Sequence, residues 1–330
     1  MPITPLVVAA MAMSYSFDFF NGLHDAPNSI STVISTRVLS PGTAVVMAGV
    51  FNLLAFLVVG TAVAQTIGEG IVRPELLDVR VIVAALAGAI ALGLASWRLE
   101  LPTSSSHALI GGLVGAAVAK AGFGSLQSPG LEIVVLFMFL SPLLGVFGAA
   151  SIMAVVVRVF SSRPQQDVHR QFRRLQLLSS SLVSLSHGAN DGQKTMGIVT
   201  ALLVASGDLP NFGVPLWVIL SAQVTIALGT VFGGWGVVRT LGSRLTKMDP
   251  VRGVSIETSA ATVILGCSLL GIPVSTTHCV SGAVMGSSVT MGSSKVRWNV
   301  ARSIGVAWVL TVPVAALVAG GAYLLTSALV

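Results

Sequence analysis

Charged side chains are scarce in this sequence of 330 residues, and long apolar runs take their place. Asp, Glu, Lys and Arg make up 9% of the chain, whereas about a quarter is usual in soluble domains. Hydrophobic residues make up 54%, and runs of roughly 20 residues recur along nearly the whole chain. The composition excludes an ordinary soluble fold and predicts an integral membrane protein.

Cysteines and basic clusters are scarce as well. The two cysteines, Cys267 and Cys279, lie in apolar surroundings without CxxC or His/Cys spacing, which excludes a disulfide framework and indicates no metal site. The net charge is +6, but the basic residues lie between apolar runs and form no patch interleaved with aromatics. We therefore expect a lipid bilayer as partner, no nucleic acid and no cofactor.

Helices are the expected element throughout, because a backbone that crosses hydrocarbon must satisfy its own polar groups. The first apolar run lacks the basic region and cleavage site of a signal peptide and continues past Tyr15, so we interpret it as a spanning helix. The predicted spans are 5–36 (interrupted), 42–66, 79–97, 106–121 and 131–158, then 176–206 (interrupted), 213–239, 254–271, 278–292 and 303–329.

A basic segment between two apolar halves predicts the topology. Residues 158–174 hold five arginines and the single acid Asp167, so this segment is expected in the cytoplasm. The sequence thus predicts a first repeat at 1–160, a basic linker at 161–175 and a second repeat at 176–330. Five crossings in each half give the two repeats opposite orientations and place both chain ends outside. Inverted repeats are typical of transporters.

One short motif occurs twice. Leu101-Pro-Thr-Ser-Ser-Ser-His107 matches Ile272-Pro-Val-Ser-Thr-Thr-His278, and each copy precedes a short Gly-rich stretch. This pattern predicts a re-entrant half-helix in each half, with proline in its first turn. A half-helix N-terminus offers unpaired N–H donors and partial positive charge, which suit phosphate or sulfate. The candidate anion-binding hydroxyls are Ser104, Ser105, Ser275, Thr276 and Thr277.

A second motif also occurs twice and aligns two aspartates, Asp25 and Asp191. An acid at mid-membrane is unfavourable unless it is paired, protonated or bound to a cation, so both are candidate coupling-ion residues. The neighbouring glycines and Pro27 predict a break in the first helix of each half. The amides around the aspartates are Asn21, a further candidate for the coupling ion, and Asn28 and Asn190, which are candidates for binding the substrate.

Further polar residues lie within apolar runs. Four histidines fall inside the two motifs, and we assign them supporting roles: His24, His107, His187 and His278. Glu257 lies deep in an apolar run and is a further candidate for the coupling ion, and Asp18 lies two turns before Asp25.

The duplicated motifs together resemble the inorganic phosphate transporter family over nearly the whole chain. The resemblance implies phosphate symport driven by sodium or protons, with the ligands bound between the repeats, and a homodimer in the cell inner membrane. It assigns Asp25, Asn28, Asn190 and Asp191 to ions and substrate, and the motif hydroxyls to phosphate.

One departure from the family pattern concerns the coupling ion. Sodium-coupled members resemble each other in carrying Asn three residues after both aspartates, whereas Lys194 takes that place in the second copy here. An ammonium would repel sodium and could pair with Asp191 or with the anion. The Gly-Gln-Lys run resembles the bacterial low-affinity branch, which implies proton coupling and uptake of phosphate with a divalent metal.

Several alternatives stay open at this point. A sulfate permease of the same family would use the same hydroxyls, although a carboxylate facing the anion favours phosphate, whose P–OH group can donate. A sodium-coupled phosphate symporter and an ion channel are further alternatives. An intramembrane hydrolase is disfavoured, because no GxSxG or HExxH pattern is present and a catalytic set has no reason to be duplicated.

Overall fold

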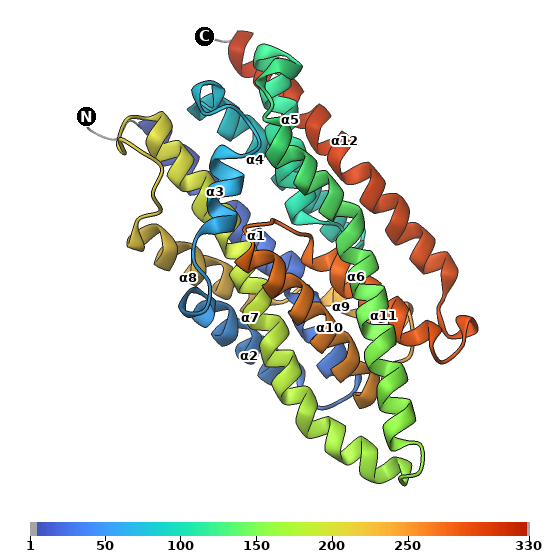
Figure 1. Cartoon of the computed structure of the whole chain (residues 1–330). Helices are drawn as coiled ribbons and strands as arrows, with labels where there is room; N and C mark the ends of the chain where they lie inside the picture. Colours follow the sequence, from blue (N-terminus) through green and yellow to red (C-terminus); the bar gives the residue numbers. More distant parts are fainter. Residues whose placement is uncertain (1–4, 329–330) are drawn as a thin grey trace.

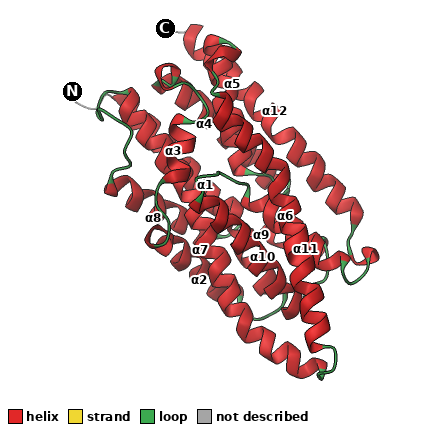
Figure 2. Ribbon diagram, viewed as in Figure 1, coloured by secondary structure: helices red, strands yellow, loops and turns green. Residues whose placement is uncertain are grey.

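The computed structural model describes residues 5–328, and within them it is helical, with one isolated bridge between Val72 and Leu126 (Figures 1 and 2). The first half contains α1 (Pro5–Ser35), α2 (Pro41–Leu54), α3 (Ala62–Glu69), α4 (Val79–Arg98), α5 (Ser105–Ala121) and α6 (Ser128–Phe160). The second half contains α7 (Gln165–Ala205), α8 (Leu216–Phe232), α9 (Trp235–Arg239), α10 (Pro250–Leu269), α11 (Thr276–Val289) and α12 (Trp298–Ala328). Short turns complete the chain: η1 (Ala55–Leu57), η2 (Pro74–Leu76), η3 (Phe123–Ser125), η4 (Thr240–Arg244) and η5 (Ser293–Lys295).

The same order of elements occurs in both halves: a long helix, a bent pair, a helix of 20 residues, a short helix and another long helix. In Figure 1, α6 runs from the upper end of the molecule to the lower end, and α12 runs the opposite way. The beginning of α1 and the end of α12 lie at the upper end, and the α6–α7 connection lies at the lower end.

The predicted breaks in the first helix of each half are wrong, because α1 and α7 are continuous. Their motif glycines serve close packing. A Cβ on Gly22 would lie 2.3 Å from the carbonyl oxygen of Ile226, and one on Gly188 would lie 2.6 Å from that of Asn52. A glycine whose surface is covered by another backbone favours helix contact and does not by itself end the helix.

The breaks occur instead in the second element of each half, which we had predicted as single spans. The α2–η1 helix meets α3 at 84°, and α8 meets α9–η4 at 62°. At the second bend Gly233 has φ +67°, a conformation that only glycine adopts readily.

The predicted linker 161–175 is helical from Gln165 onward. Val168 and Phe172 are buried one turn apart and pack with Met153 and Val251, which gives this basic segment an apolar face. The helix therefore extends past the membrane-spanning part of α7.

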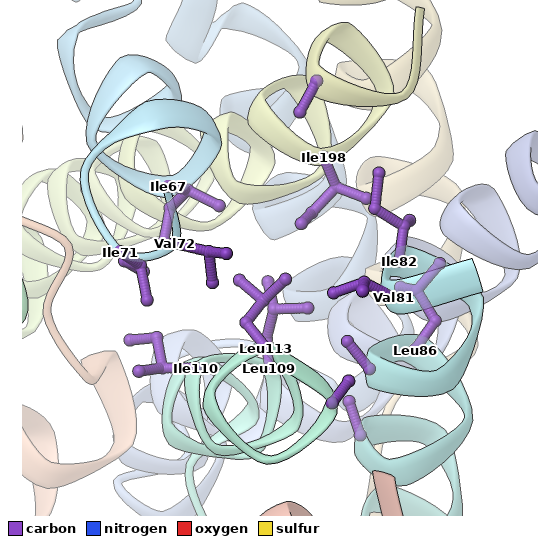
Figure 3. Packing of buried hydrophobic residues seen from close by; sticks show 14 of the residues in the cluster. Ile67, Ile71, Val72, Val81, Ile82, Leu86, Leu109, Ile110, Leu113 and Ile198 are labelled. Carbon is purple, nitrogen blue, oxygen red and sulfur yellow. The ribbon is translucent and has the colours of Figure 1, made fainter. Parts of the chain in front are cut away.

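The two halves do not form separate bodies. α5 packs along α12 and α11 along α6, while α1 packs against α8 and α2 against α7. Figure 3 shows part of the core, where Ile67, Ile82, Leu109, Leu113 and Ile198 bring α3, α4, α5 and α7 together. This interleaving lets both halves supply residues to one central site.

The outer surface is largely apolar, and the interior holds buried polar residues beside the apolar core. Phe139, Phe147, Val309 and Leu317 are each more than 60% exposed on α6 and α12, as suits a lipid-facing surface. Within residues 5–328, four helices are long and apolar enough to cross a membrane, or six if each bent pair is one span. α7 and α10 are not among them, because many of their buried side chains are polar. α5 and α11 have 17 and 14 residues. At 1.5 Å per residue they extend only about 20–26 Å, less than the roughly 30 Å of hydrocarbon.

Glycine contacts between these helices give the first prediction. A Cβ on Gly115 of α5 would lie 2.1 Å from the carbonyl oxygen of Ala316 on α12, whereas nothing lies within 4 Å of one on Gly305. Gly115→Ala should lower the stability by about 1–3 kcal/mol through overpacking. Gly305→Ala, the matched control on α12, should be neutral or slightly stabilising. Thermal denaturation of both variants in detergent measures the difference, and equal melting temperatures would contradict the packing role.

Candidate functional site

The two motif loops meet at the centre of the molecule and are anchored in parallel ways. The hydroxyl of Ser104 accepts a hydrogen bond from the backbone N–H of His107 at 3.1 Å, and Ser275 does the same for His278 at 3.1 Å. These serines therefore cap α5 and α11. The hydroxyl of Ser106 donates to the backbone oxygen of Val274 at 3.0 Å, which joins the two loops.

Each loop is also held where it begins, by a threonine of the opposite half. Thr66 donates to the backbone oxygen of Gly271 at 2.7 Å, and Thr240 donates to that of Glu100 at 3.1 Å. Gly271 and Glu100 have positive φ values of 72° and 54°. An ion pair of 2.7 Å with Arg244 also holds Glu100 in place. The two loops thus turn in the same way. The first loop has in addition the ion pair between Glu100 and Arg244.

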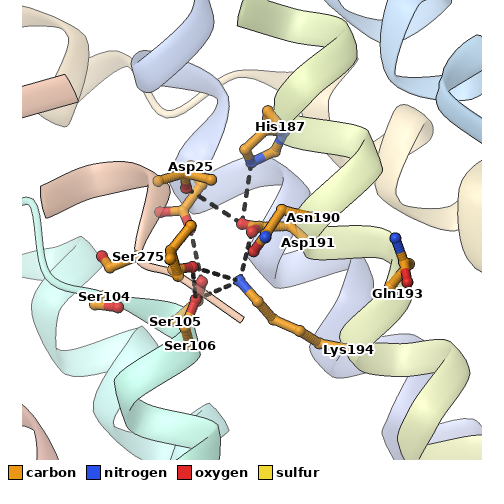
Figure 4. Close-up of polar contacts among 12 residues, drawn as sticks. Asp25, Ser104, Ser105, Ser106, His187, Asn190, Asp191, Gln193, Lys194 and Ser275 are labelled. Atoms are coloured by element: carbon orange, nitrogen blue, oxygen red, sulfur yellow. Dashed lines mark hydrogen bonds and ion pairs between the residues drawn. The ribbon is translucent and has the colours of Figure 1, made fainter. Parts of the chain in front are cut away.

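Asp25 of α1 is buried and accepts three hydrogen bonds. One comes from Ser105 at 2.7 Å (Figure 4). The others come from Thr277 at 3.2 Å and from Nδ1 of His24 at 2.8 Å. Both motif loops therefore supply a hydroxyl to one carboxylate.

Asp191 of α7 is also fully buried and pairs with the fully buried Lys194. The ammonium of Lys194 donates to Asp191 Oδ1, to the hydroxyl of Ser106 and, at 3.3 Å, to the backbone oxygen of Val274. Thr276 donates to the second oxygen of Asp191 at 3.3 Å. Lys194 thus links α7 to both motif loops.

The aspartates converge on a third side chain, His187. Its Nε2 lies 3.3 Å from Asp191 Oδ2, and ligand atoms of Asp25, His187 and Asp191 all lie within 4.8 Å of one another. Nδ1 of His187 is 3.2 Å from the side-chain oxygen of Asn52. This group could hold a cation.

Two of the three asparagines of the aspartate motifs, Asn28 and Asn190, point to different places. Asn28 donates to Thr277 at 2.9 Å and to Thr276 at 3.3 Å, so it faces the hydroxyls. Asn190 donates to Ser268 at 3.0 Å and to the backbone oxygen of Ile272 at 3.5 Å. It therefore faces α10 and the start of the second loop.

Glu257 lies apart from the two aspartates, in a polar group of its own. It accepts hydrogen bonds from Thr32 at 2.5 Å, Ser179 at 2.5 Å and Gln176 at 3.0 Å. These donors come from α1 and α7, so Glu257 joins three helices. The sequence placed Glu257 with the coupling-ion residues, and the structure separates it from them.

The supporting histidines divide into two pairs. His24 and His187 contact the aspartates, and Nε2 of His24 also lies 3.2 Å from the hydroxyl of Ser96. His107 and His278 contact each other edge to face at 4.3 Å, and His278 stacks on Trp308 at 3.9 Å. The second pair therefore packs where α5, α11 and α12 meet.

A small cavity lies beside the site, between α1, α4 and the first loop. Its lining includes Phe17, Asn21, His24, Trp97 and Ser105. The space open to water-sized spheres is about 30 Å³. Asn21 lines this cavity, and neither of its amide atoms has a hydrogen-bond partner among the described residues.

The centre also contains residues that were not predicted from the sequence to belong to it. Ser106 is one, although the repeat register indicates it, because it aligns with Thr277. Gln193 is another: its side-chain oxygen accepts the backbone N–H groups of Val63 at 2.9 Å and Ala64 at 3.3 Å, at the start of α3. No local pattern indicates Gln193, because its partners lie far away in the sequence.

The buried ion pair gives the second prediction. Lys194→Met leaves Asp191 without its counter-charge and should lower the stability by about 3 kcal/mol. The double variant Lys194→Met/Asp191→Asn removes the stranded charge and should regain part of that loss. Melting temperatures of the four proteins in the double-mutant cycle measure the coupling. Additive effects would contradict a stabilising interaction between the two side chains.

Comparisons with known proteins found similar sequences and a similar solved structure. A probable low-affinity inorganic phosphate transporter of Rhizobium meliloti (strain 1021) is 48% identical over 97% of this chain and 96% of that protein. One of the same description from Bacillus subtilis (strain 168) is 37% identical over 96% of both chains. Among solved structures, one described as the sodium-dependent phosphate transporter matches with a TM-score of 0.90 and 24% identity, over 99% of this chain and 100% of that chain.

The fold is thus that of a membrane phosphate transporter, and the relatives are described as transporters and not as enzymes. The pattern of the phosphate transporter family matches residues 21–166 and 159–319. The resemblance seen in the duplicated motifs is confirmed, and the chain belongs to the phosphate transporter family.

Proposed function

We propose that this protein imports inorganic phosphate across the cell inner membrane by symport with a cation. One observation carries the proposal: hydroxyls from both loops, two aspartates and a lysine converge in a buried centre (Figure 4). The relatives described as low-affinity inorganic phosphate transporters support phosphate as the substrate.

Phosphate would be bound by donors that now contact carboxylates. Ser105, Thr276, Thr277 and Asn28 are donors at the centre, and the ammonium of Lys194 adds a positive charge. A hydroxyl that donates to a carboxylate can turn to a phosphate oxygen. The hydroxyls of Ser104 and Ser275 hold the loops as caps, and we assign them to shaping the site.

The carboxylates favour phosphate over sulfate. Hydrogen phosphate carries one P–OH group and dihydrogen phosphate two, which can donate to Asp25 or Asp191, whereas sulfate at neutral pH only accepts. A carboxylate that faces sulfate would repel it without a compensating hydrogen bond.

We infer that protons drive the transport in preference to sodium. Asn28 faces the hydroxyls in the first half, and Lys194 takes the corresponding place in the second, where its ammonium would repel a sodium ion. The solved relative is described as sodium-dependent, so sodium coupling is the alternative to be tested.

Asp25, His187 and Asp191 could also hold a divalent cation that travels with phosphate as cargo. Glu257 and its three donors are a candidate for a separate coupling-ion site.

We further propose that the halves form an inverted repeat with both chain ends outside and a homodimeric assembly. The repeated order of elements and the position of the α6–α7 connection opposite to both ends support this topology (Figure 1). The basic residues of that connection favour the cytoplasmic side.

Uptake of labelled phosphate into proteoliposomes tests the function. Sodium and pH gradients are imposed separately, with sulfate as a competitor. Accumulation driven by an inside-alkaline gradient, with weak competition by sulfate, is the expected result. A lack of phosphate uptake under either gradient would reject the proposal, and uptake driven by sodium alone would reject proton coupling.

The hydroxyl donors give the third prediction. Ser105→Ala and Thr276→Ala should each weaken phosphate binding by about ten- to a hundredfold, because a hydrogen bond to a charged group contributes about 1.5–3 kcal/mol. Titration of the purified protein with phosphate measures the affinity. Ser303→Ala on the exposed surface of α12 is the matched control. Unchanged affinity in both site variants would remove these hydroxyls from the phosphate site.

The fourth prediction concerns the lysine. Lys194→Asn replaces the ammonium with an amide oxygen that can coordinate sodium. The variant should lose uptake driven by a pH gradient, and any remaining uptake should require sodium. Proteoliposome assays with sodium, potassium or choline outside measure this dependence. Wild-type transport with the same ion dependence would show that Lys194 has no part in coupling.

A further inference from the structure

A second group of buried polar side chains lies two turns before Asp25. Asp18 and Asn21 of α1 are 0% and 2% exposed, and Thr195 of α7 is 0% exposed. Thr195 faces Asp18 across the contact between the two helices. Asp18 and Asn21 lie three residues apart and share one face of α1.

None of these side chains has a hydrogen-bond partner among the described residues. The atoms without a partner are both carboxylate oxygens of Asp18, both amide atoms of Asn21 and the hydroxyl of Thr195. Buried polar atoms are nearly always hydrogen-bonded, so a group of five without partners requires an occupant that bridges them. Water or a cation among these side chains, or a proton on Asp18 that Thr195 could accept, would satisfy them.

The group is distinct from the centre around the two aspartates. Asp25 accepts three hydrogen bonds and Asp191 pairs with Lys194, whereas Asp18 has no such partner. An isolated buried carboxylate is unfavourable by several kcal/mol unless it is protonated or binds a cation.

The charges around Asp18 distinguish between a proton and a cation as its occupant. Tyr15 on the same helix faces Asp18, but its hydroxyl bonds to Ser221 at 2.7 Å. From α7, Asp191 and Lys194 face it, and α8, which packs along α1, carries no titratable residue. His107 of α5 faces Lys194. The ammonium of Lys194 opposes a metal cation beside Asp18, and a proton removes the unpaired charge with no further ligands.

A route for the proton adjoins the group. Asn21 lines the cavity between α1 and α4, which also reaches His24 and Ser105. A cavity of about 30 Å³ has room for about two water molecules. Asn21 lies one turn from Asp18 on α1 and lines this cavity together with Ser105, whose hydroxyl bonds to Asp25 at 2.7 Å.

We propose that Asp18, with Asn21 and Thr195, forms a proton-binding site that couples to the phosphate centre. This inference rests on the proposed phosphate symport. Asp18 takes a proton from a hydronium ion in the cavity: one O–H bond forms on its carboxylate, one breaks on hydronium, and water remains. Once Asp18 is neutral, less negative charge offsets the positive charge of Lys194. The centre then attracts an anion more strongly. By linkage, bound phosphate favours the protonated form of Asp18.

Infrared spectroscopy of the purified protein tests the site independently of transport. At neutral pH without phosphate, the wild type should show the band of a buried protonated carboxyl group, and Asp18→Asn should lack that band. Asp18→Glu should restore a carboxyl band, and Asp167→Asn, at an exposed acid of α7, should keep the wild-type band. A difference spectrum between the wild type and Asp18→Asn without a carboxyl band would overturn the proposal even if the protein transports phosphate, whereas a band from the buried carboxyl group of Glu257 would be common to both proteins.

Proton release and uptake test the coupling. At an alkaline pH at which the infrared band of the wild type is lost without phosphate, a pH indicator in weakly buffered solution should record proton uptake when phosphate is added to the wild type and to Asp167→Asn, and less uptake with Asp18→Asn. In proteoliposomes, accumulation driven by a pH gradient should fall by about tenfold or more in Asp18→Asn. Equal proton uptake in wild type and Asp18→Asn would overturn the assignment, and so would sodium binding that Asp18→Asn abolishes. If phosphate uptake is absent from the wild type while the infrared band behaves as expected, the proposed function fails and the proton site stands.

Discussion

The ion pair between Lys194 and Asp191 is the interaction on which the centre depends. Both side chains are fully buried, and the ammonium also contacts Ser106 and the backbone of Val274. A buried charge is tolerated only with a counter-charge and further hydrogen bonds. α7 is therefore fixed against both motif loops at once, and a change in any one of these partners alters the position of the others.

Three other buried carboxylates differ in how they are satisfied, and this difference separates their roles. Asp25 accepts hydrogen bonds from both loops, and Glu257 accepts three from α1 and α7. Asp18 has no partner within the described residues. The low dielectric of the interior amplifies such differences. Asp25 is thus an anchored carboxylate at the centre, and Glu257 belongs to a separate polar group between three helices. Asp18 forms a site that needs an occupant.

Close backbone contact makes this convergence of charges feasible. α5 lies on α12 and α11 on α6, where Gly115 and Gly286 meet the backbone of the opposite half. Without a strong hydrophobic force between helices in lipid, van der Waals contact of this kind holds a bundle together. The interleaved halves can then present two short helices and their loops to one centre, each from its own direction.

The sequence by itself determined the class of protein, the duplicated motifs and most of the central residues. Scarce charge, long apolar runs and buried acids are local properties, and the register of the repeat even indicates Ser106. The continuity of α1 and α7, the bends after α2 and α8, and the separation of Glu257 from Asp25 were decided by tertiary structure. The reason is that a glycine can end a helix or admit a neighbouring backbone, and a buried acid takes its role from donors on other helices. Those neighbours lie up to about 250 residues away in the chain, as Thr277 does from Asp25, so no local pattern specifies them.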